Sequence, residues 1–311
     1  MSSTVIYQGT CDASAAVRLG SSSMFVSASD EDHILRVYDR DAPGMPLATT
    51  DLAAFLKPDD PAQEPDIEGA AAVGDLIYWI TSHGRNKDRE EQESRQRFFA
   101  TSATTSDGKV RIAPVGRAYK RLIRDLLGTP ELNAFDLSRA AKLAPEERGG
   151  LNLEGMAPTS EGHLLLGFRN PVPEGRALVV ALRNPEELIE SGAASATFSV
   201  AGRLDLGGRG IRAIEYVADS RTYLIVAGAF DDAHDFRIYQ WSGALKDGAV
   251  EIDVELGDCK PEELIVTEVR GRTHELELLS DDGDRDVEGK KCKKAKPEKR
   301  SFRGLRTTIE V

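Results

Sequence analysis

One pattern recurs five times along this chain: a short segment with a charged residue near its start, a turn, an apolar segment, a loop and a second apolar segment. The apolar segments are rich in β-branched and aromatic residues, which favour strands. A repeat built from strands cannot bury its apolar faces alone, so the copies must pack against one another. Closure into a ring achieves this, and the pattern predicts a five-bladed β-propeller. The segments that open the repeats are 11–15, 67–71, 153–157, 211–214 and 262–265.

The last repeat is one strand short. It offers strands only at 262–265, 275–279 and 305–309, whereas the N-terminal segment 4–8 belongs to no other repeat. Pairing that segment with the last blade would close the ring and remove two exposed sheet edges. We therefore expect residues 1–311 to form a single all-β domain, a five-bladed propeller closed by the N-terminal strand.

Two stretches interrupt the repeats. Residues 118–150 are expected to form a small helical insertion between blades two and three, because apolar residues recur there at helical spacing and a Gly-x-Pro sequence follows. A second helix is expected near 135–143. The insertion either covers a blade edge or overhangs the channel mouth. Residues 281–300 are dense in charge and glycine, which is typical of a solvated loop. The helical apolar residues are Tyr119, Leu122, Ile123, Leu126 and Leu127.

The composition excludes several classes of partner. A net charge of −12 argues against nucleic-acid binding and against binding to an anionic membrane. No run is apolar enough to span a bilayer, and the first ten residues lack a signal-peptide pattern. Three cysteines are too few for a disulfide framework, so we expect a soluble, cytoplasmic protein. Cys11 and Cys259 each precede an inner strand, of blades one and five, and Cys292 lies in the blade-five loop on the same face, which leaves a thiolate site or a disulfide open.

One charged residue per blade is expected at an equivalent position near the channel. Inner strands run along the axis of a propeller, so alternate residues face the channel, and Asp66 and Asn152 would share the face of the following glutamates. Carboxylates that converge on a narrow axis repel each other, and they need a cation, an arginine partner or protonation with raised pKa values. The aligned residues are Asp12, Glu68, Glu154, Arg212 and Glu263.

Several occupants fit such a ring. A divalent cation, calcium before magnesium because its coordination is looser, would be held by Asp12, Glu68, Glu154 and Glu263. A small anionic molecule would be clamped by the guanidinium of Arg212. The carboxylates could also act as an acid and a base. The alternative is a polar, water-filled channel that binds nothing.

The loops after the second strands add a second tier at the same face. His83 follows Glu68 by fifteen residues, and Arg169 follows Glu154 by the same interval. His83 is the candidate metal ligand or general base near neutral pH, and Arg169 with Asn170 would bind the ligand. The tier also includes the acidic residues Asp30, Glu31, Asp32, Asp231, Asp232, Asp281 and Asp282.

Several sequence segments carry a family resemblance: LNLEGM at 151–156 with GFRNP at 167–171 and RAL at 176–178, DIEG at 66–69 with YWITSH at 78–83, and GGRGIR at 207–212. The chain resembles, over nearly its whole length, a bacterial family known as domain of unknown function 3616. The resemblance implies a propeller loosely similar to the phytase-like esterase propellers, and hence hydrolysis of an ester or phosphoester. The chain lacks the dense acidic calcium-binding motif of the phytases.

The expected function follows from these residues and the resemblance together. It is a metal-assisted hydrolase of a small anionic ester or phosphoester, with catalytic roles for His83, Asp66 and Glu154 and ligand binding by Arg169, Arg212 and Asn170. The alternative is a propeller that binds a ligand or a partner protein without turnover. Fold cannot decide between them, because propellers serve both purposes.

Overall fold

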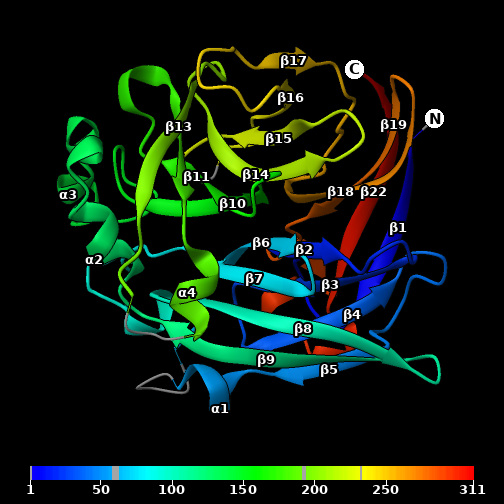
Figure 1. Cartoon of the computed structure of the whole chain (residues 1–311). Coiled ribbons are helices and arrows are strands. Elements are labelled where there is room, and N and C mark those ends of the chain that lie inside the picture. The colour runs from blue at the N-terminus through cyan, green and yellow to red at the C-terminus, as the bar shows by residue number, and fades with distance from the viewer. Residues whose placement is uncertain (1, 58–62, 191–193, 232) are drawn as a thin grey trace.

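The chain forms five four-stranded antiparallel sheets arranged as blades around a central axis (Figure 1), which confirms the predicted all-β, five-bladed propeller. The computed structural model describes residues 2–57, 63–190, 194–231 and 233–311, so Asp232 lies outside the described residues. The inner strands contact each other in cyclic order, from β2 to β6, β10, β14, β18 and back to β2. These five strands are β2 (Ala15–Arg18), β6 (Ile67–Val73), β10 (Asn152–Pro158), β14 (Gly210–Val217) and β18 (Pro261–Arg270).

Each blade continues outward through antiparallel neighbours. Blade one adds β3 (Met24–Ala28), β4 (Ile34–Asp39) and β5 (Ala48–Asp51), and blade two adds β7 (Leu76–Thr81), β8 (Phe98–Ser106) and β9 (Lys109–Tyr119). Blade three adds β11 (Leu164–Asn170), β12 (Ala177–Leu182) and β13 (Phe198–Leu204), and blade four adds β15 (Thr222–Gly228), β16 (Phe236–Trp241) and β17 (Val250–Ile252). Blade five adds β19 (Thr273–Ser280), β22 (Ser301–Glu310) and β1 (Ser3–Gln8).

The N-terminal strand is the outermost strand of blade five. β1 pairs antiparallel with β22, with Ser3 opposite Arg306 and Gln8 opposite Ser301. Tyr7 is fully buried there, and its hydroxyl donates a 2.6 Å hydrogen bond to Glu277. Its ring packs 5.2 Å from the rings of Phe25 in blade one and Phe302 in blade five. The side chain of Tyr7 therefore joins the last blade to the first.

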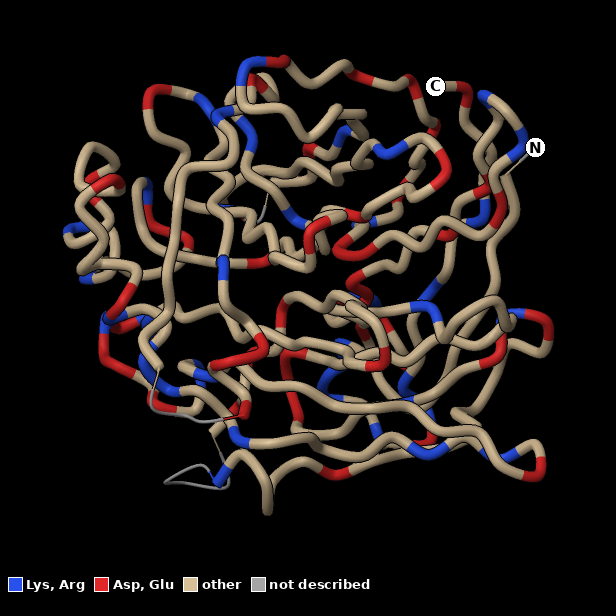
Figure 2. Tube along the Cα trace, in the orientation of Figure 1, with Lys and Arg blue, Asp and Glu red and all other residues tan. Residues whose placement is uncertain are grey.

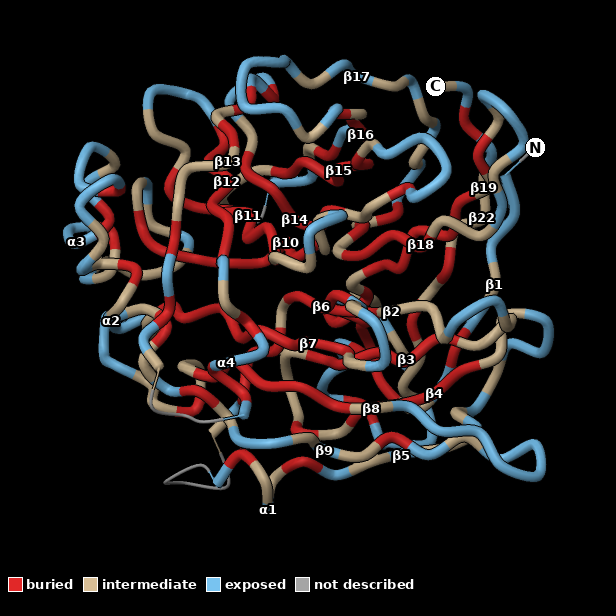
Figure 3. The backbone as a smooth tube through the Cα atoms, viewed as in Figure 1, coloured by how far each residue is buried: buried red, intermediate tan, exposed pale blue. Residues whose placement is uncertain are grey.

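The hydrophobic core is divided among the spaces between the blades. Five clusters of buried side chains each join two neighbouring blades around the ring. Figure 3 shows the consequence: the inner and middle strands are mostly buried, while outer strands such as β5 and β17 and many of the hairpin turns are exposed. Burial of a blade's apolar face therefore depends on its two neighbours, as expected for repeats that cannot fold alone.

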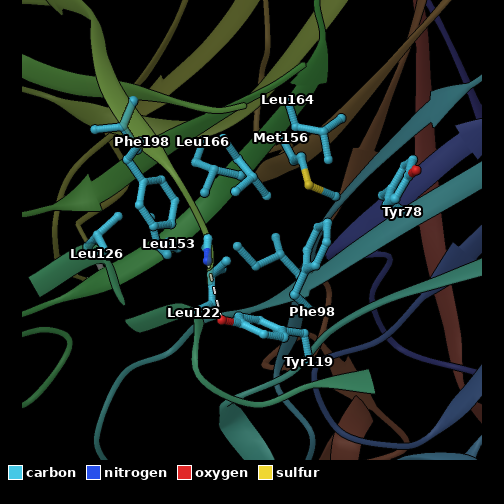
Figure 4. Close-up of a cluster of buried hydrophobic side chains, with 14 of the residues drawn as sticks. Tyr78, Phe98, Tyr119, Leu122, Leu126, Leu153, Met156, Leu164, Leu166 and Phe198 are labelled. Carbon is cyan, nitrogen blue, oxygen red and sulfur yellow. Dashed lines mark hydrogen bonds between the residues drawn. The ribbon is translucent and has the colours of Figure 1, made fainter. Parts of the chain in front are cut away.

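The segment between β9 and β10 contains three short helices: α2 (Leu122–Leu127), the 3-10 helix η2 (Pro130–Phe135) and α3 (Leu137–Ala140). The last of these is shorter than the helix expected at 135–143, because Asp136 adopts a positive φ of 51° and separates η2 from α3. Leu122 and Leu126 pack against Phe98 of blade two and Leu153 of blade three (Figure 4). Four further short helices are α1 (Ala53–Leu56), η1 (Glu93–Arg95), η3 (Pro173–Gly175) and α4 (Pro185–Glu190).

Residues 281–300 are more ordered than the solvated loop expected from their charge. They contain a small hairpin, β20 (Asp286–Val287) and β21 (Lys290–Lys291), and two 3-10 helices, η4 (Cys292–Lys294) and η5 (Pro297–Lys299). Cys292 forms a disulfide with Cys11, with the two Cα atoms 5.8 Å apart, whereas Cys259 is buried and free. The disulfide fixes this segment beside the first blade. None of the helices among the described residues is long and apolar enough to cross a membrane.

Candidate functional site

A β-bulge occurs at the same place in four of the inner strands. The pairing register shifts at Glu68 in β6, Glu154 in β10, Arg212 in β14 and Glu262 in β18, so each of these residues is the extra residue of its strand. A bulge turns a side chain out of the regular alternation, and bulges are common beside functional sites. The four charged side chains are thereby placed at equivalent positions around the axis, at one end of the channel.

Three of these residues, Glu68, Arg212 and Glu262, line a cavity of about 280 Å³ at the channel mouth. Acidic segments of the chain gather near the centre of Figure 2, where the inner strands approach one another. The cavity is lined by eight carboxylates and five cationic side chains, so its charge favours a cation before an anion. The charged lining residues are Asp30, Glu64, Asp66, Glu68, Arg95, Glu146, Arg169, Arg212, Lys260, Glu262, Asp281, Asp284 and Lys293.

Three of the carboxylates, those of Asp30, Asp66 and Glu68, converge on one side of the cavity, here called the acidic wall. One oxygen each from Asp30, Asp66 and Glu68 lies within 4.8 Å of the other two, and Asp30 belongs to a similar group with Asp12 and Glu31. Arg95 approaches Asp66, with Nη1 3.2 Å from Oδ2. Asp12 accepts hydrogen bonds from the hydroxyls of Ser14 and Ser29, at 3.2 and 3.0 Å. The arrangement offers only oxygen atoms, which are the ligands that calcium and magnesium prefer.

Burial and mutual repulsion disfavour the charged forms of these acids. Burial, followed by repulsion from neighbouring carboxylates, holds the pKa of Asp30, Glu68 and Glu262 well above the ordinary range. Burial also raises the pKa of Asp66, although Arg95 partly opposes the rise. Burial and then Asp281 raise the pKa of Asp12 to about 7. Such shifts are expected where carboxylates lack a compensating cation.

Beside the acidic wall lies an ion-pair network centred on Glu154, here called the arginine wall. Its Oε1 accepts hydrogen bonds from Asn152 Nδ2 at 2.8 Å and from Arg169 Nη1 at 3.0 Å, and its Oε2 lies 3.5 Å from Arg212 Nη1. Arg212 also contacts Glu262 at 3.2 Å, and both arginines donate to the backbone carbonyl of Asp231. Glu154 therefore holds two guanidinium groups beside the cavity.

The structure brings together most of the residues predicted for the site, but three lie elsewhere. Glu263 points away from the cavity, and its carboxylate accepts hydrogen bonds from the backbone N–H groups of Leu264 and Ala16. His83 does not line the cavity; Nδ1 donates to the carbonyl of Thr81 at 2.7 Å, and burial lowers its pKa to about 4. Asn170 instead donates two 2.7 Å hydrogen bonds to the carbonyls of Pro145 and Glu147, which hold the segment after α3.

The sequence alignment of the repeats selects Glu263, whereas the bulged residue of β18 is its neighbour Glu262. In β6, β10 and β14, the bulged residue follows Ile or Leu and precedes Gly or Ala, which is a recognisable pattern. In β18, two glutamates are consecutive, so the sequence does not show which one is the bulged residue, because either one can be aligned with Glu68. Arg95, Lys260 and Lys293 also line the cavity, and the sequence gives no periodic signal for them.

The raised pKa of Glu68 predicts a pH dependence of stability. A carboxyl group with a raised pKa in the folded state binds its proton more tightly there than in the unfolded chain, so stability is lost as pH rises from about 4 through the folded pKa. Glu68→Gln removes this loss. In metal-free buffer, the melting temperature of the variant minus that of the wild type should therefore increase with pH above about 4. A difference that stays constant or falls with pH would contradict the pKa assignment, and Glu131→Gln, at an exposed site, should show no trend.

Comparison with known proteins identifies one family. A model described as "Protein of unknown function (DUF3616)" matches residues 12–113 and 115–286. A search of curated protein sequences finds no match to the chain.

Solved structures with a similar fold share little sequence with the chain. Glutaminyl cyclase of Myxococcus xanthus is 12% identical over 100% of this chain and 97% of its own, with a TM-score of 0.44. A gluconolactonase of Xanthomonas campestris is 14% identical over 89% of this chain and 72% of its own, with a TM-score of 0.43. Hydrazine synthase of Kuenenia stuttgartiensis is 8% identical over 88% of this chain and 57% of its own, with a TM-score of 0.39, so this chain spans little more than half of that chain's length. Similarity at this level carries no information about chemistry.

Proposed function

This chain belongs to the DUF3616 family of proteins of unknown function, and we propose that its channel mouth binds a divalent cation and hydrolyses a small anionic ester or phosphoester. The observation that carries the proposal is the convergence of Asp30, Asp66 and Glu68, whose oxygens lie within 4.8 Å of one another in a cavity that three arginines also line. A cation on this wall would favour the charged forms of the three acids, which burial and neighbouring carboxylates disfavour.

Calcium is the cation that the donor set favours. The wall offers carboxylate oxygens from separate strands and loops, without nitrogen or sulfur ligands, and calcium accepts irregular oxygen coordination completed by water. Asp12 belongs with Asp30 to a second cluster of carboxylates, which extends the acidic wall. Glu154 stays with Arg169 and Arg212 rather than joining the cation, because its two oxygens already contact them.

The arginine wall supplies the contact for an anionic substrate. Arg212 and Arg169 line the same cavity as the acidic wall, so an ester or phosphate oxygen could lie between a guanidinium group and the cation. A bound divalent cation polarises such an oxygen and makes a bound water more acidic. Asp66 is the proton acceptor in this scheme, through the carboxylate oxygen that does not ligate the cation, and Arg95, 3.2 Å from Oδ2, orients its carboxylate. His83 has no role in the scheme.

A second function, cation binding without turnover, is favoured by one observation. Arg169 and Arg212 are each held by carboxylates already, so the arginine wall is electrically compensated before any substrate arrives. Substrate binding by these arginines would require a shift of those ion pairs. Without that shift, the cation would serve only to stabilise the ring.

The test is a titration with calcium. We expect calorimetry to show binding near one equivalent, weakened at least tenfold in Asp66→Asn and in Glu68→Gln, because each variant removes a charged oxygen ligand. The exposed-site variant Glu131→Gln is the matched control and should bind calcium like the wild type. Phosphate should bind only after calcium, and a panel of phosphomonoesters and esters then separates turnover from simple binding. Absence of any heat with calcium, magnesium or zinc would reject the cation site.

A further inference from the structure

A second and larger cavity, of about 750 Å³, lies between the helical insertion and blades three and four. Phe135 and Arg139 line it from the insertion, Arg148 from the segment that follows, Arg203 from β13, and Phe230 from the loop between β15 and β16. It is close to the channel mouth but distinct from it, because Asn170 lines this cavity while the preceding residue, Arg169, lines the other.

Three arginines and two carboxylates, those of Asp136 and Glu174, line this cavity, so its formal charge is +1, whereas that of the channel mouth is −3. Arg203 pairs with Glu174 at 2.7 Å. Arg139 and Arg148, in contrast, have no ion pair with any carboxylate in the described part of the chain. In a protein with a net charge of −12, two uncompensated arginines in one cavity are an attractive site for an anion.

The aromatic residues add a preference for a planar ligand. The guanidinium carbon of Arg148 lies 5.4 Å from the centroid of the Phe230 ring, and that of Arg203 lies 5.6 Å from the centroid of the Phe135 ring. Stacking of this kind holds the flat guanidinium groups in place, which reduces the entropy they would lose on binding. Aromatic and guanidinium planes both accept a further flat group against them.

The backbone is also open to a ligand. Gly149 and Gly208 have positive φ angles of 81° and 80°, and no atom lies within 4 Å of the place where a Cβ would be. Glycine allows close approach of a ligand to the backbone. In the described structure, neither backbone N–H donates a hydrogen bond, so both remain available to an anionic oxygen.

We propose that this cavity binds a planar organic anion of the aromatic carboxylate class. The carboxylate is held by Arg139 and Arg148, and the ring lies against Phe135 and Phe230. This site does not depend on a cation at the channel mouth, since none of these four residues lines that cavity.

The experiment is a calorimetric titration of the whole chain with 1-naphthoate. We expect saturable binding that weakens at least tenfold in the double variant Arg139→Gln/Arg148→Gln. The matched control is Arg111→Gln/Arg117→Gln, which removes the same charge from exposed positions on β9 and should leave the affinity unchanged. Because Arg139 and Arg148 are themselves exposed, both double variants should fold, and their melting temperatures verify this.

Two further ligands and one further variant separate the explanations. Cyclohexanecarboxylate should bind at least tenfold more weakly than 1-naphthoate, and so should the uncharged 1-naphthalenemethanol. Equal affinity for either would overturn the planar or the anionic part of the proposal, and an unchanged affinity in Arg139→Gln/Arg148→Gln would overturn the site itself. Glu68→Gln should keep full affinity for 1-naphthoate, so failure of the channel-mouth cation site leaves this result intact.

Discussion

Removal of the Cys11–Cys292 disulfide should lower the free energy of unfolding by about 5 kcal/mol, because the bond closes a very long loop in the unfolded chain. The two cysteines are separated by 281 residues, so nearly the whole propeller lies inside the loop. Without the bond, the unfolded chain has a higher conformational entropy, which favours unfolding. Chemical denaturation of Cys11→Ala/Cys292→Ala against the oxidised wild type measures the difference.

The controls for this prediction use the remaining cysteine and a reductant. Cys259→Ala removes a buried side chain without breaking a bond, and it should cost only about 1 kcal/mol, the typical effect of a point substitution. A reductant should destabilise the wild type and leave the double variant unchanged. A wild type equally stable with and without reductant would contradict the loop argument.

Replacement of Glu154 by glutamine should destabilise the fold by about 3–5 kcal/mol, the cost of breaking a buried ion pair from one side. The side chains of Glu154, Arg169 and Arg212 are only 3%, 9% and 5% exposed. Glutamine has nearly the same shape, so no cavity forms, and the loss comes from the two guanidinium groups left with less compensation. Thermal and chemical denaturation both report it.

An exposed ion pair provides the comparison for Glu154. Arg89 and Glu147 are 2.8 Å apart, with side chains 57% and 36% exposed, so Glu147→Gln should change stability by only about 0–1 kcal/mol. A double-mutant cycle of Glu154→Gln with Arg169→Gln should show coupling of about 0.5–3 kcal/mol, as is usual for residues in direct contact. Similar effects for Glu154→Gln and Glu147→Gln would mean that Glu154 does not hold the arginine wall.

The fold could be predicted from the sequence because its signals are local and repeated. Strands such as 76–80 and 236–241 contain runs of β-branched and aromatic residues between turns, and five copies leave few alternatives to a ring. Glu68, Glu154 and Arg212 could be aligned for the same reason, since each follows Ile or Leu and precedes Gly or Ala.

The remaining details of the site depend on features that a repeat pattern does not encode. A bulge adds one residue to a strand without changing its composition, so the bulged Glu262 could not be told from its neighbour Glu263. The positive φ of 56° at His83 and the hydrogen bond to Thr81 place the ring away from the cavity, and no spacing rule reveals this. The partner of Cys292 lies at the other end of the sequence, so only the closed ring makes the disulfide evident.

The two terminal strands lie outside the loop closed by the disulfide, and this has a mechanical consequence. β1 ends at Gln8, before Cys11, and β22 begins at Ser301, after Cys292. Because the strands are antiparallel with Ser3 opposite Arg306, their free ends lie at the same end of the pair (Figure 1). Tension between the ends therefore breaks the β1–β22 hydrogen bonds one at a time, and the extension stops at the disulfide. Once the terminal strands have separated from β19 and from blade one, the load passes through the disulfide, and the blades inside the loop carry no force.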